Sequence, residues 1–198
     1  MYLYGASGHG KVIRDIVEAC GQKVKGYIDD NHALNELHEL PVFHSLEGVD
    51  EVLISIGDNH QRKRIAEIVP CPIASSVVHP NAVVAPSARI GNGTVVMAGV
   101  IINVDTQIGR HCIINTGATV DHECIISDYV HISPHATLCG CIDVGEGAWV
   151  GAGAVVIPGI HIGAWSVIGA GSVVVEDIPD GCLAYGNPCR IVKKINQE

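Results

Sequence analysis

The stretch GATVDHECIIS, residues 117–127, sets an imidazole beside a carboxylate, His122 and Glu123, in surroundings that are otherwise small and aliphatic. A neutral imidazole is the side chain best suited to accept a proton near pH 7. A neighbouring carboxylate can hold the imidazole in one tautomer and stabilise the imidazolium that forms. The pair therefore predicts a general base, provided that the fold keeps both groups out of a packed core.

A repeat of six residues, uninterrupted from Val78 to Val174, indicates the fold that holds this pair. Every first position of the repeat is Val, Ile or Leu. These positions are Val78, Val84, Ile90, Val96, Ile102, Ile108, Ile114, Val120, Ile126, Ile132, Leu138, Val144, Val150, Val156, Ile162, Ile168 and Val174. The fourth positions contain seven glycines and no Val, Ile or Leu. A period this short predicts a β-helix in which each repeat supplies one strand and one turn, with three repeats to a coil.

His122 and Glu123 occupy the third and fourth positions of their repeat, which form a corner of the predicted prism. A corner points outward, so neither ionisable group has to be buried. One coil has 18 residues, and Gly140 therefore stacks on His122 in the next coil. A glycine lets a substrate approach the backbone, and its N–H can donate to an oxygen on which negative charge develops.

Residues 1–75 lack the six-residue repeat, and their pattern predicts a separate Rossmann-like α/β unit. MYLY, KVKGYI and EVLISI read as strands of a parallel sheet, residues 11–20 as a helix, and a second helix starts near His60. A glycine turn between strand and helix can hold a diphosphate, and strand-end loops gather ligands at one sheet edge. The unit is about half the size of a dinucleotide domain, so a mononucleotide-linked ligand fits better than NAD. The predicted contacts are Gly5, Ser7, Gly8, His9, Gly10, Asp29, Asp30 and Gly57.

The segments IGNGTV, VGAGAV, IGAWSV and IGAGSV resemble the hexapeptide-repeat acyltransferases. The combination of YGASGHGKV with VDHE, which spans essentially the whole chain, resembles N-acetyltransferases that act on UDP-4-amino sugars in bacillosamine-type glycan pathways. The resemblance implies a left-handed parallel β-helix over residues 76–198 with a C-terminal cap. It also implies a homotrimer with active sites between subunits, and acetyl-CoA as co-substrate.

The resemblance also assigns roles to residues of this chain. His122 corresponds to the base, Glu123 to its partner and Gly140 to the amide that stabilises the oxyanion, while the acceptor amine attacks acetyl-CoA directly. His131 corresponds to a histidine near the acetyl group. Further contacts to acetyl-CoA are implied for Gly151 and Gly169, and for Arg190 and Lys193 in the tail YGNPCRIVKKI, whose cations could face the phosphates.

The composition limits which classes of binding partner and which cellular compartment we expect for this protein. The formal net charge of −9 argues against a nucleic-acid partner, which would require surplus Lys and Arg. The chain shows no signal peptide and no run of about 18 apolar residues, so we expect a cytoplasmic protein without membrane insertion. Eight scattered cysteines then predict packing residues in a reducing compartment, with no metal site.

Several alternatives stay open at this stage. The same architecture serves sialic acid O-acetyltransferases and GDP-perosamine N-acetyltransferases. A γ-type carbonic anhydrase would use three histidines around zinc, and His111, His122, His131 and His135 make it conceivable, although they fall at different phases of the coil. A non-catalytic scaffold is the third class. His111, His135 and His161 are otherwise expected to be surface or packing residues.

Overall fold

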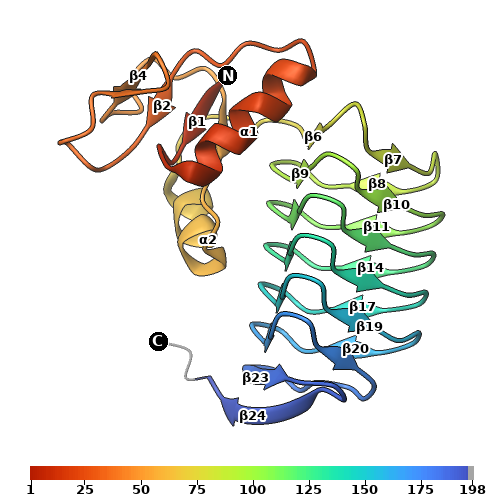
Figure 1. Cartoon of the computed structure of the whole chain (residues 1–198). Helices are drawn as coiled ribbons and strands as arrows, with labels where there is room; N and C mark the ends of the chain where they lie inside the picture. The colour runs from red at the N-terminus through yellow and green to blue at the C-terminus, as the bar shows by residue number, and fades with distance from the viewer. Residues whose placement is uncertain (196–198) are drawn as a thin grey trace.

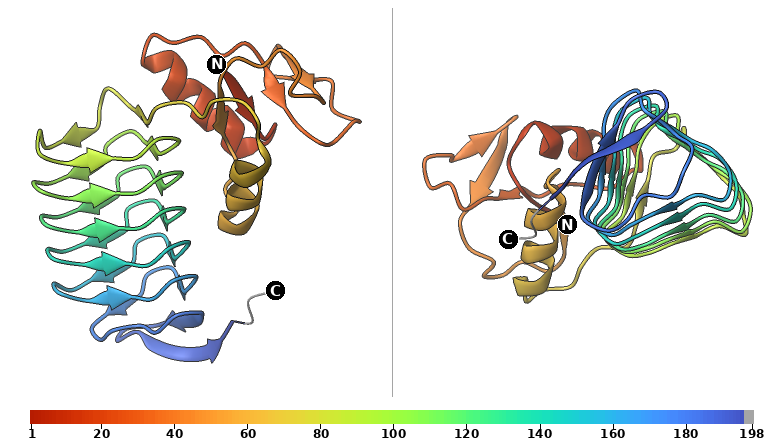
Figure 2. Two further views of the ribbon diagram at one scale, coloured as in Figure 1. Left: turned by 180° about the vertical axis from the view of Figure 1, so that it is seen from behind. Right: turned by 90° about the horizontal axis from the view of Figure 1, so that it is seen from below.

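The six-residue repeat folds into a left-handed parallel β-helix, with an α/β unit attached to its side (Figure 1). The structure, a computed structural model, describes residues 1–195. The predicted second unit, residues 76–198, therefore ends three residues beyond the described part. Viewed along its axis, the β-helix has a triangular cross-section (Figure 2). The fold class predicted from the sequence is confirmed.

Two-residue strands build the three faces of the prism, and each strand pairs in parallel with the strand 18 residues away. Face 1 comprises β6 (Val77–Val78), β9 (Val95–Val96), β12 (Ile113–Ile114), β15 (His131–Ile132), β18 (Trp149–Val150) and β21 (Val167–Ile168), continued by β23 (Cys182–Tyr185) and β24 (Arg190–Lys194). Face 2 comprises β7 (Val83–Val84), β10 (Ile101–Ile102), β13 (Thr119–Val120), β16 (Thr137–Leu138), β19 (Val155–Val156) and β22 (Val173–Val174). Face 3 comprises β8 (Arg89–Ile90), β11 (Gln107–Ile108), β14 (Ile125–Ile126), β17 (Asp143–Val144) and β20 (His161–Ile162).

The interior of the prism is filled by the first positions of the repeat together with the small fifth positions. Ile114, Val120 and Val150 are fully buried, as are Ala118 and Cys124 at fifth positions. Because the second residue of each strand points inward and the first points outward, one aliphatic side chain per repeat fills the core. The antiparallel pair β23–β24 follows the last coil.

The N-terminal unit is a five-stranded sheet in the order β3-β4-β2-β1-β5, with two helices. Its elements are β1 (Tyr2–Tyr4), α1 (Gly8–Ala19), β2 (Tyr27–Ile28), β3 (Glu36–Leu37), β4 (Leu40–Phe43), β5 (Val52–Ile54) and α2 (Asn59–Ile68). Strands β4, β2, β1 and β5 run parallel, which agrees with the parallel sheet predicted for β1, β2 and β5 and adds β4 to it. Within the described residues, no helix is both long enough and apolar enough to span a bilayer.

Two elements differ from the sequence expectation. Helix α1 begins at Gly8 rather than near Lys11, so Gly8, His9 and Gly10 form its first turn. No element was predicted between the second and third strands, where the structure forms the antiparallel hairpin β3–β4. Its turn residues, His38 and Glu39, both have positive φ, 47° and 63°. Such turns usually carry Asn or Gly, and because neither residue is present here, the hairpin has no recognisable signal in the sequence.

A buried arginine joins the two units. Arg62 of α2 is 1% exposed and uses all five of its N–H donors at 2.7–3.1 Å. Its acceptors are the backbone carbonyls of Ile56, Gly57, His111 and Tyr129 and the side-chain oxygen of Asn59. Burial lowers the pKa of Arg62 to about 10, which leaves it charged at neutral pH. Two of the acceptors belong to the β-helix, so the guanidinium holds α2 against it.

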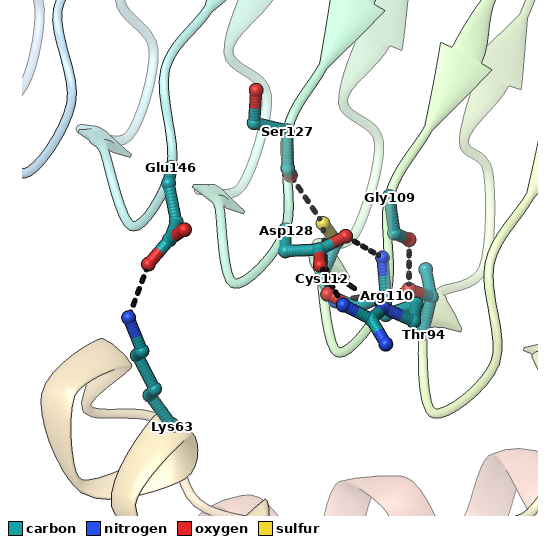
Figure 3. Close-up of polar contacts among 8 residues, drawn as sticks. All are labelled: Lys63, Thr94, Gly109, Arg110, Cys112, Ser127, Asp128 and Glu146. Carbon is teal, nitrogen blue, oxygen red and sulfur yellow. Dashed lines mark hydrogen bonds and ion pairs between the residues drawn. The ribbon is translucent and has the colours of Figure 1, made fainter.

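Further contacts of α2 follow the corner between faces 3 and 1. The side-chain amide of Asn59 donates to the carbonyl of Gly147 at 3.0 Å, and Lys63 pairs with Glu146. Figure 3 shows this ion pair reaching from α2 to the β-helix, near the pair Arg110–Asp128 on neighbouring coils. The His60 ring stacks on Trp165, with 4.2 Å between centroids. One helix therefore contacts several successive coils.

We predict that Arg62→Met destabilises the protein by roughly 2–4 kcal/mol, because it leaves five acceptors without their buried donor. Arg64→Met, an exposed position in the same helix, is the control and should change stability by less than about 0.5 kcal/mol. Urea denaturation followed by circular dichroism measures both. Equal stabilities of the two variants would contradict the role given to Arg62.

Candidate active site

His122 and Glu123 lie exposed at the corner between faces 2 and 3, directly after β13. The imidazole Nδ1 is 3.0 Å from Glu123 Oε2, and the side chains are 48% and 63% exposed. The backbone fixes both residues, since the His122 N–H donates to Asp121 Oδ1 at 2.8 Å and the Glu123 N–H donates to the Val104 carbonyl at 3.0 Å. With Nδ1 occupied by the carboxylate, Nε2 is the nitrogen available to accept a proton.

Gly140 lies directly against the His122 ring. A Cβ at this position would be 2.5 Å from His122 Cε1 and would also overlap Nε2, so no residue but glycine fits without moving the ring. Within residues 1–195, no protein group accepts a hydrogen bond from the Gly140 N–H. An imidazole and a backbone N–H without a protein acceptor are thus neighbours at this corner, and groups of these two kinds can take a proton and stabilise an oxyanion.

His131 lies away from this pair, on face 1, with its side chain largely buried. Its ring stacks on Trp149, with centroids 5.3 Å apart, and its Nε2 is 3.1 Å from Asn115 Nδ2. Burial is the main cause that lowers the pKa of His131 to about 3, with the charges of Arg62 and His9 adding to it. This imidazole is therefore neutral at physiological pH.

His131, Gly151 and Gly169 line one groove at the corner between faces 1 and 2, with a cavity of about 390 Å³. Trp149 and Ser133 also line it and are joined by a 2.7 Å hydrogen bond from the indole N–H. Trp149 was not among the residues predicted from the sequence, although an aromatic residue at an outward strand position among Val and Ile is a usable signal. The other two predicted coenzyme contacts, Arg190 and Lys193, are exposed on β24, where Arg190 lies 3.7 Å from Glu176.

A second pocket, of about 220 Å³, opens at the strand ends of the N-terminal unit. Five of the eight predicted nucleotide contacts line it, namely Gly5, Ser7, Asp29, Asp30 and Gly57. Asp29 also braces the glycine turn, because its carboxylate accepts hydrogen bonds from the N–H groups of Ala6 and Asn31. Asp30 accepts one from the Tyr4 hydroxyl at 3.0 Å. The rest of the lining consists of Tyr4, Ile56, Gln61, Arg64 and Ile65.

Arg64, the cation of this pocket, was not among the residues predicted from the sequence. It lies in the first turns of α2, the helix that follows Gly57, so its position after the third strand was a usable signal. A cation beside a glycine turn suits a diphosphate.

The other three predicted nucleotide contacts do not line this pocket. Gly10 is buried, and a Cβ there would lie 3.3 Å from the Tyr27 ring and overlap the Gly5 carbonyl, so this glycine serves the packing of α1 on the sheet. Gly8 is the exposed first residue of α1. His9 is partly buried, with Nε2 lacking a hydrogen-bond partner in the described chain, and burial lowers its pKa to about 4.

The four histidines considered for a zinc anhydrase do not meet within one chain. His111 stacks on Tyr129 at the corner between faces 3 and 1, and His135 covers Gly117 at the corner between faces 1 and 2. His161 is exposed on face 3, with Nδ1 3.6 Å from Asp143. Among residues 1–195, the ligand atoms of three or more His, Cys, Asp or Glu side chains come together only at His122, Glu123 and Cys141.

We predict that stability falls as the pH drops from about 6.5 to 4, because burial lowers the pKa of His9 and His111 to about 4 and that of His131 to about 3. The unfolded chain takes up these protons first, so stability is complete above the unfolded pKa of about 6.5 and is lost below it. Each group accounts for at most roughly 2 kcal/mol between pH 6.5 and 4.5.

Urea denaturation at a series of pH values measures this loss. His111→Gln should lose less stability than the unmodified protein over that range, whereas His161→Gln, at an exposed site, should follow it. An unchanged loss in His111→Gln would show that this histidine does not titrate as described.

Comparison with known proteins agrees with the two-part fold. Residues 1–69 match the PglD N-terminal domain family, and residues 142–175 match the bacterial transferase hexapeptide family. The chain is 31% identical to a GDP-perosamine N-acetyltransferase of Escherichia coli over 98% of both chains. It is 45% identical to a UDP-N-acetylbacillosamine N-acetyltransferase of Bacillus subtilis, over 48% of this chain and 50% of the relative.

A solved structure extends the similarity to the whole fold. PerB from Caulobacter crescentus, in complex with CoA and GDP-perosamine, superposes with a TM-score of 0.92 and 39% identity, covering 97% of this chain and 96% of that one. The alignment thus includes both the α/β unit and the β-helix. The chain belongs to the hexapeptide-repeat acetyltransferases, within the group of sugar N-acetyltransferases that the sequence motifs resemble.

Proposed function

We propose that the protein transfers the acetyl group of acetyl-CoA to the 4-amino group of a nucleotide-linked 4-amino-4,6-dideoxy sugar, for bacterial glycan biosynthesis. The observation that carries the proposal is the arrangement at one corner of the β-helix, where the His122 ring, paired with Glu123 through Nδ1, lies against Gly140, whose N–H has no protein acceptor within residues 1–195. Attack of an amine on a thioester needs both a proton acceptor and a donor to the developing oxyanion.

The chemistry follows from these groups. As the amine nitrogen bonds to the thioester carbon, the proton it loses passes to His122 Nε2, and Glu123 stabilises the imidazolium through Nδ1. The carbonyl oxygen becomes an oxyanion within reach of the Gly140 N–H. Collapse of this intermediate breaks the carbon–sulfur bond, and the thiolate of coenzyme A takes the proton back from the imidazolium. Neither His122 nor Glu123 changes overall.

The nucleotide sugar would occupy the N-terminal pocket, where a cation, two carboxylates and a glycine turn meet. The motif resemblance favours a UDP-linked acceptor. A GDP-linked acceptor is the second candidate, favoured by the similarity over 98% of the chain to a GDP-perosamine enzyme. Perosamine is itself a 4-amino-4,6-dideoxy sugar, so both candidates present the same nucleophile to His122.

A homotrimer would explain why the predicted catalytic residues and the predicted coenzyme contacts lie along different edges of face 2. The groove with His131, Gly151 and Gly169 lies along one edge of face 2, and His122 with Gly140 lies along the other. If face 2 of each chain packs about a three-fold axis, one chain's His122 edge meets its neighbour's groove. The outward residues of face 2 suit such packing, since all are uncharged and β-branched. They are Val83, Ile101, Thr119, Thr137, Val155 and Val173.

We place acetyl-CoA in that groove, with Arg190 and Lys193 toward its phosphates. We also place the reaction in the cytoplasm, a proposal supported by the eight free thiols of the chain, which suit a reducing compartment.

We predict that the protein, given acetyl-CoA and a UDP- or GDP-linked 4-amino-4,6-dideoxy sugar, forms the N-acetylated sugar. Mass spectrometry identifies this product. His122→Ala should lower kcat by about 10²–10⁴-fold, since it removes the base. Glu123→Gln should lower kcat less, because the imidazole remains. His161→Ala, which removes an exposed histidine from face 3, is the matched control and should keep full activity.

The choice of acceptor also decides between the alternatives. Turnover with sialic acid alone would keep the chemistry and replace the acceptor. If the folded protein acetylates none of these acceptors, the enzyme assignment is rejected in favour of a non-catalytic scaffold.

We also predict that the protein assembles as a homotrimer. Sedimentation equilibrium should give a mass about three times that of the 20.8 kDa chain. Ile101→Glu, which puts a charge on face 2, should dissociate the trimer and abolish activity, because it separates the two halves of the site. Gln107→Glu, at the equivalent outward position on face 3, should do neither. A monomeric active protein would disprove the shared site.

A further inference from the structure

Cys141 lies beside the proposed base and has no part in the mechanism above. Its Sγ is 3.8 Å from Glu123 Oε2, which is 3.0 Å from His122 Nδ1. One ligand atom from each of the three side chains lies within 4.8 Å of the others, and all three residues are exposed. The group therefore offers one nitrogen, one oxygen and one sulfur ligand on the surface of the single chain.

The β-helix itself brings these ligands together. Glu123 and Cys141 occupy the same corner position in successive coils, 18 residues apart, and the Cys141 N–H donates to the His122 carbonyl at 2.9 Å. The three Cα positions are therefore fixed by the backbone ladder rather than by a flexible loop. Side-chain rotation alone can adjust the ligand atoms around an ion.

The ligand types and spacing suit zinc. Zn²⁺ binds imidazole, carboxylate and thiolate at about 2.0–2.3 Å, which in a tetrahedron separates the ligand atoms by about 3.3–3.8 Å. Two separations here, 3.0 and 3.8 Å, lie close to this range, and all three ligand atoms lie within 4.8 Å of one another. Three protein ligands leave a fourth position for water. Mg²⁺ and Ca²⁺ prefer oxygen ligands and do not fit this set.

We propose that His122, Glu123 and Cys141 bind Zn²⁺ and that the bound ion inhibits the enzyme; the inhibitory part rests on the proposed function. Zinc takes the lone pair of Nδ1 and an oxygen of Glu123, and the Cys141 thiol releases its proton to solvent as sulfur coordinates. The one remaining proton of the neutral imidazole then resides on Nε2. Without a lone pair, Nε2 cannot accept the proton of the attacking amine.

Binding is measured by titrating Zn²⁺ into the metal-free protein in competition with a chromogenic chelator, in thiol-free buffer. We expect about one ion per chain, and an affinity at least about tenfold lower in Cys141→Ser, because a hydroxyl is a poor replacement for thiolate. Cys71→Ser makes the same change at a remote thiol and should bind zinc normally. No binding, or equal binding by Cys141→Ser and the unmodified protein, would overturn the proposal.

Inhibition is measured by mass spectrometry of the acetylated sugar, because released coenzyme A has a thiol that binds zinc. Zn²⁺ should inhibit the unmodified protein, EDTA should reverse the effect, and Mg²⁺ should have none. Cys141→Ser should keep its activity in the absence of zinc and need at least about tenfold more zinc for half-inhibition. Equal sensitivity of the two proteins would overturn the inhibitory role. If no acceptor is acetylated, the proposed function fails while the chelator titration still decides whether the site exists.

Discussion

The structure depends on one constraint, the stacking of each 18-residue coil on the last in strict register. Strands of two residues have no stability of their own, and only the ladder from coil to coil gives their backbone groups partners. Any shift of the frame would bring turn residues into the core and aliphatic side chains to the surface. The uninterrupted repeat from Val78 to Val174 meets this constraint.

Register also determines which side chains meet. Residues 18 apart become neighbours, so His122 lies over Gly140 and Arg110 pairs with Asp128 at 2.7 Å. The proposed base thus needs no loop to position it. A corner of the prism holds its backbone, a carboxylate one residue away pairs with its ring, and a glycine one coil later leaves room for that ring. The same geometry explains why a cysteine can share the corner.

The features of the β-helix that depend on the six-residue repeat could be predicted from the sequence. The core positions, the corner at His122 and the stacking of Gly140 all follow from counting in sixes. The hairpin β3–β4 could not be predicted, because its turn uses His38 and Glu39 in place of the usual Asn or Gly. The role of Arg62 was also hidden, since a charged residue in an exposed-looking helix gives no sign that carbonyls from another unit will surround it. Gly10 looked like a ligand contact because packing and phosphate approach both select glycine.

The contacts of α2 have a consequence for how the molecule comes apart. A solenoid is a one-dimensional array whose coils interact only with their neighbours, and such arrays can fray from an end one unit at a time. Here a single helix contacts His111, Tyr129, Gly147 and Trp165, which lie at the same corner of four successive coils. None of those coils can open without losing contacts to α2. The helix thus couples repeats that would otherwise melt independently, and the central β-helix and the N-terminal unit unfold as one cooperative body.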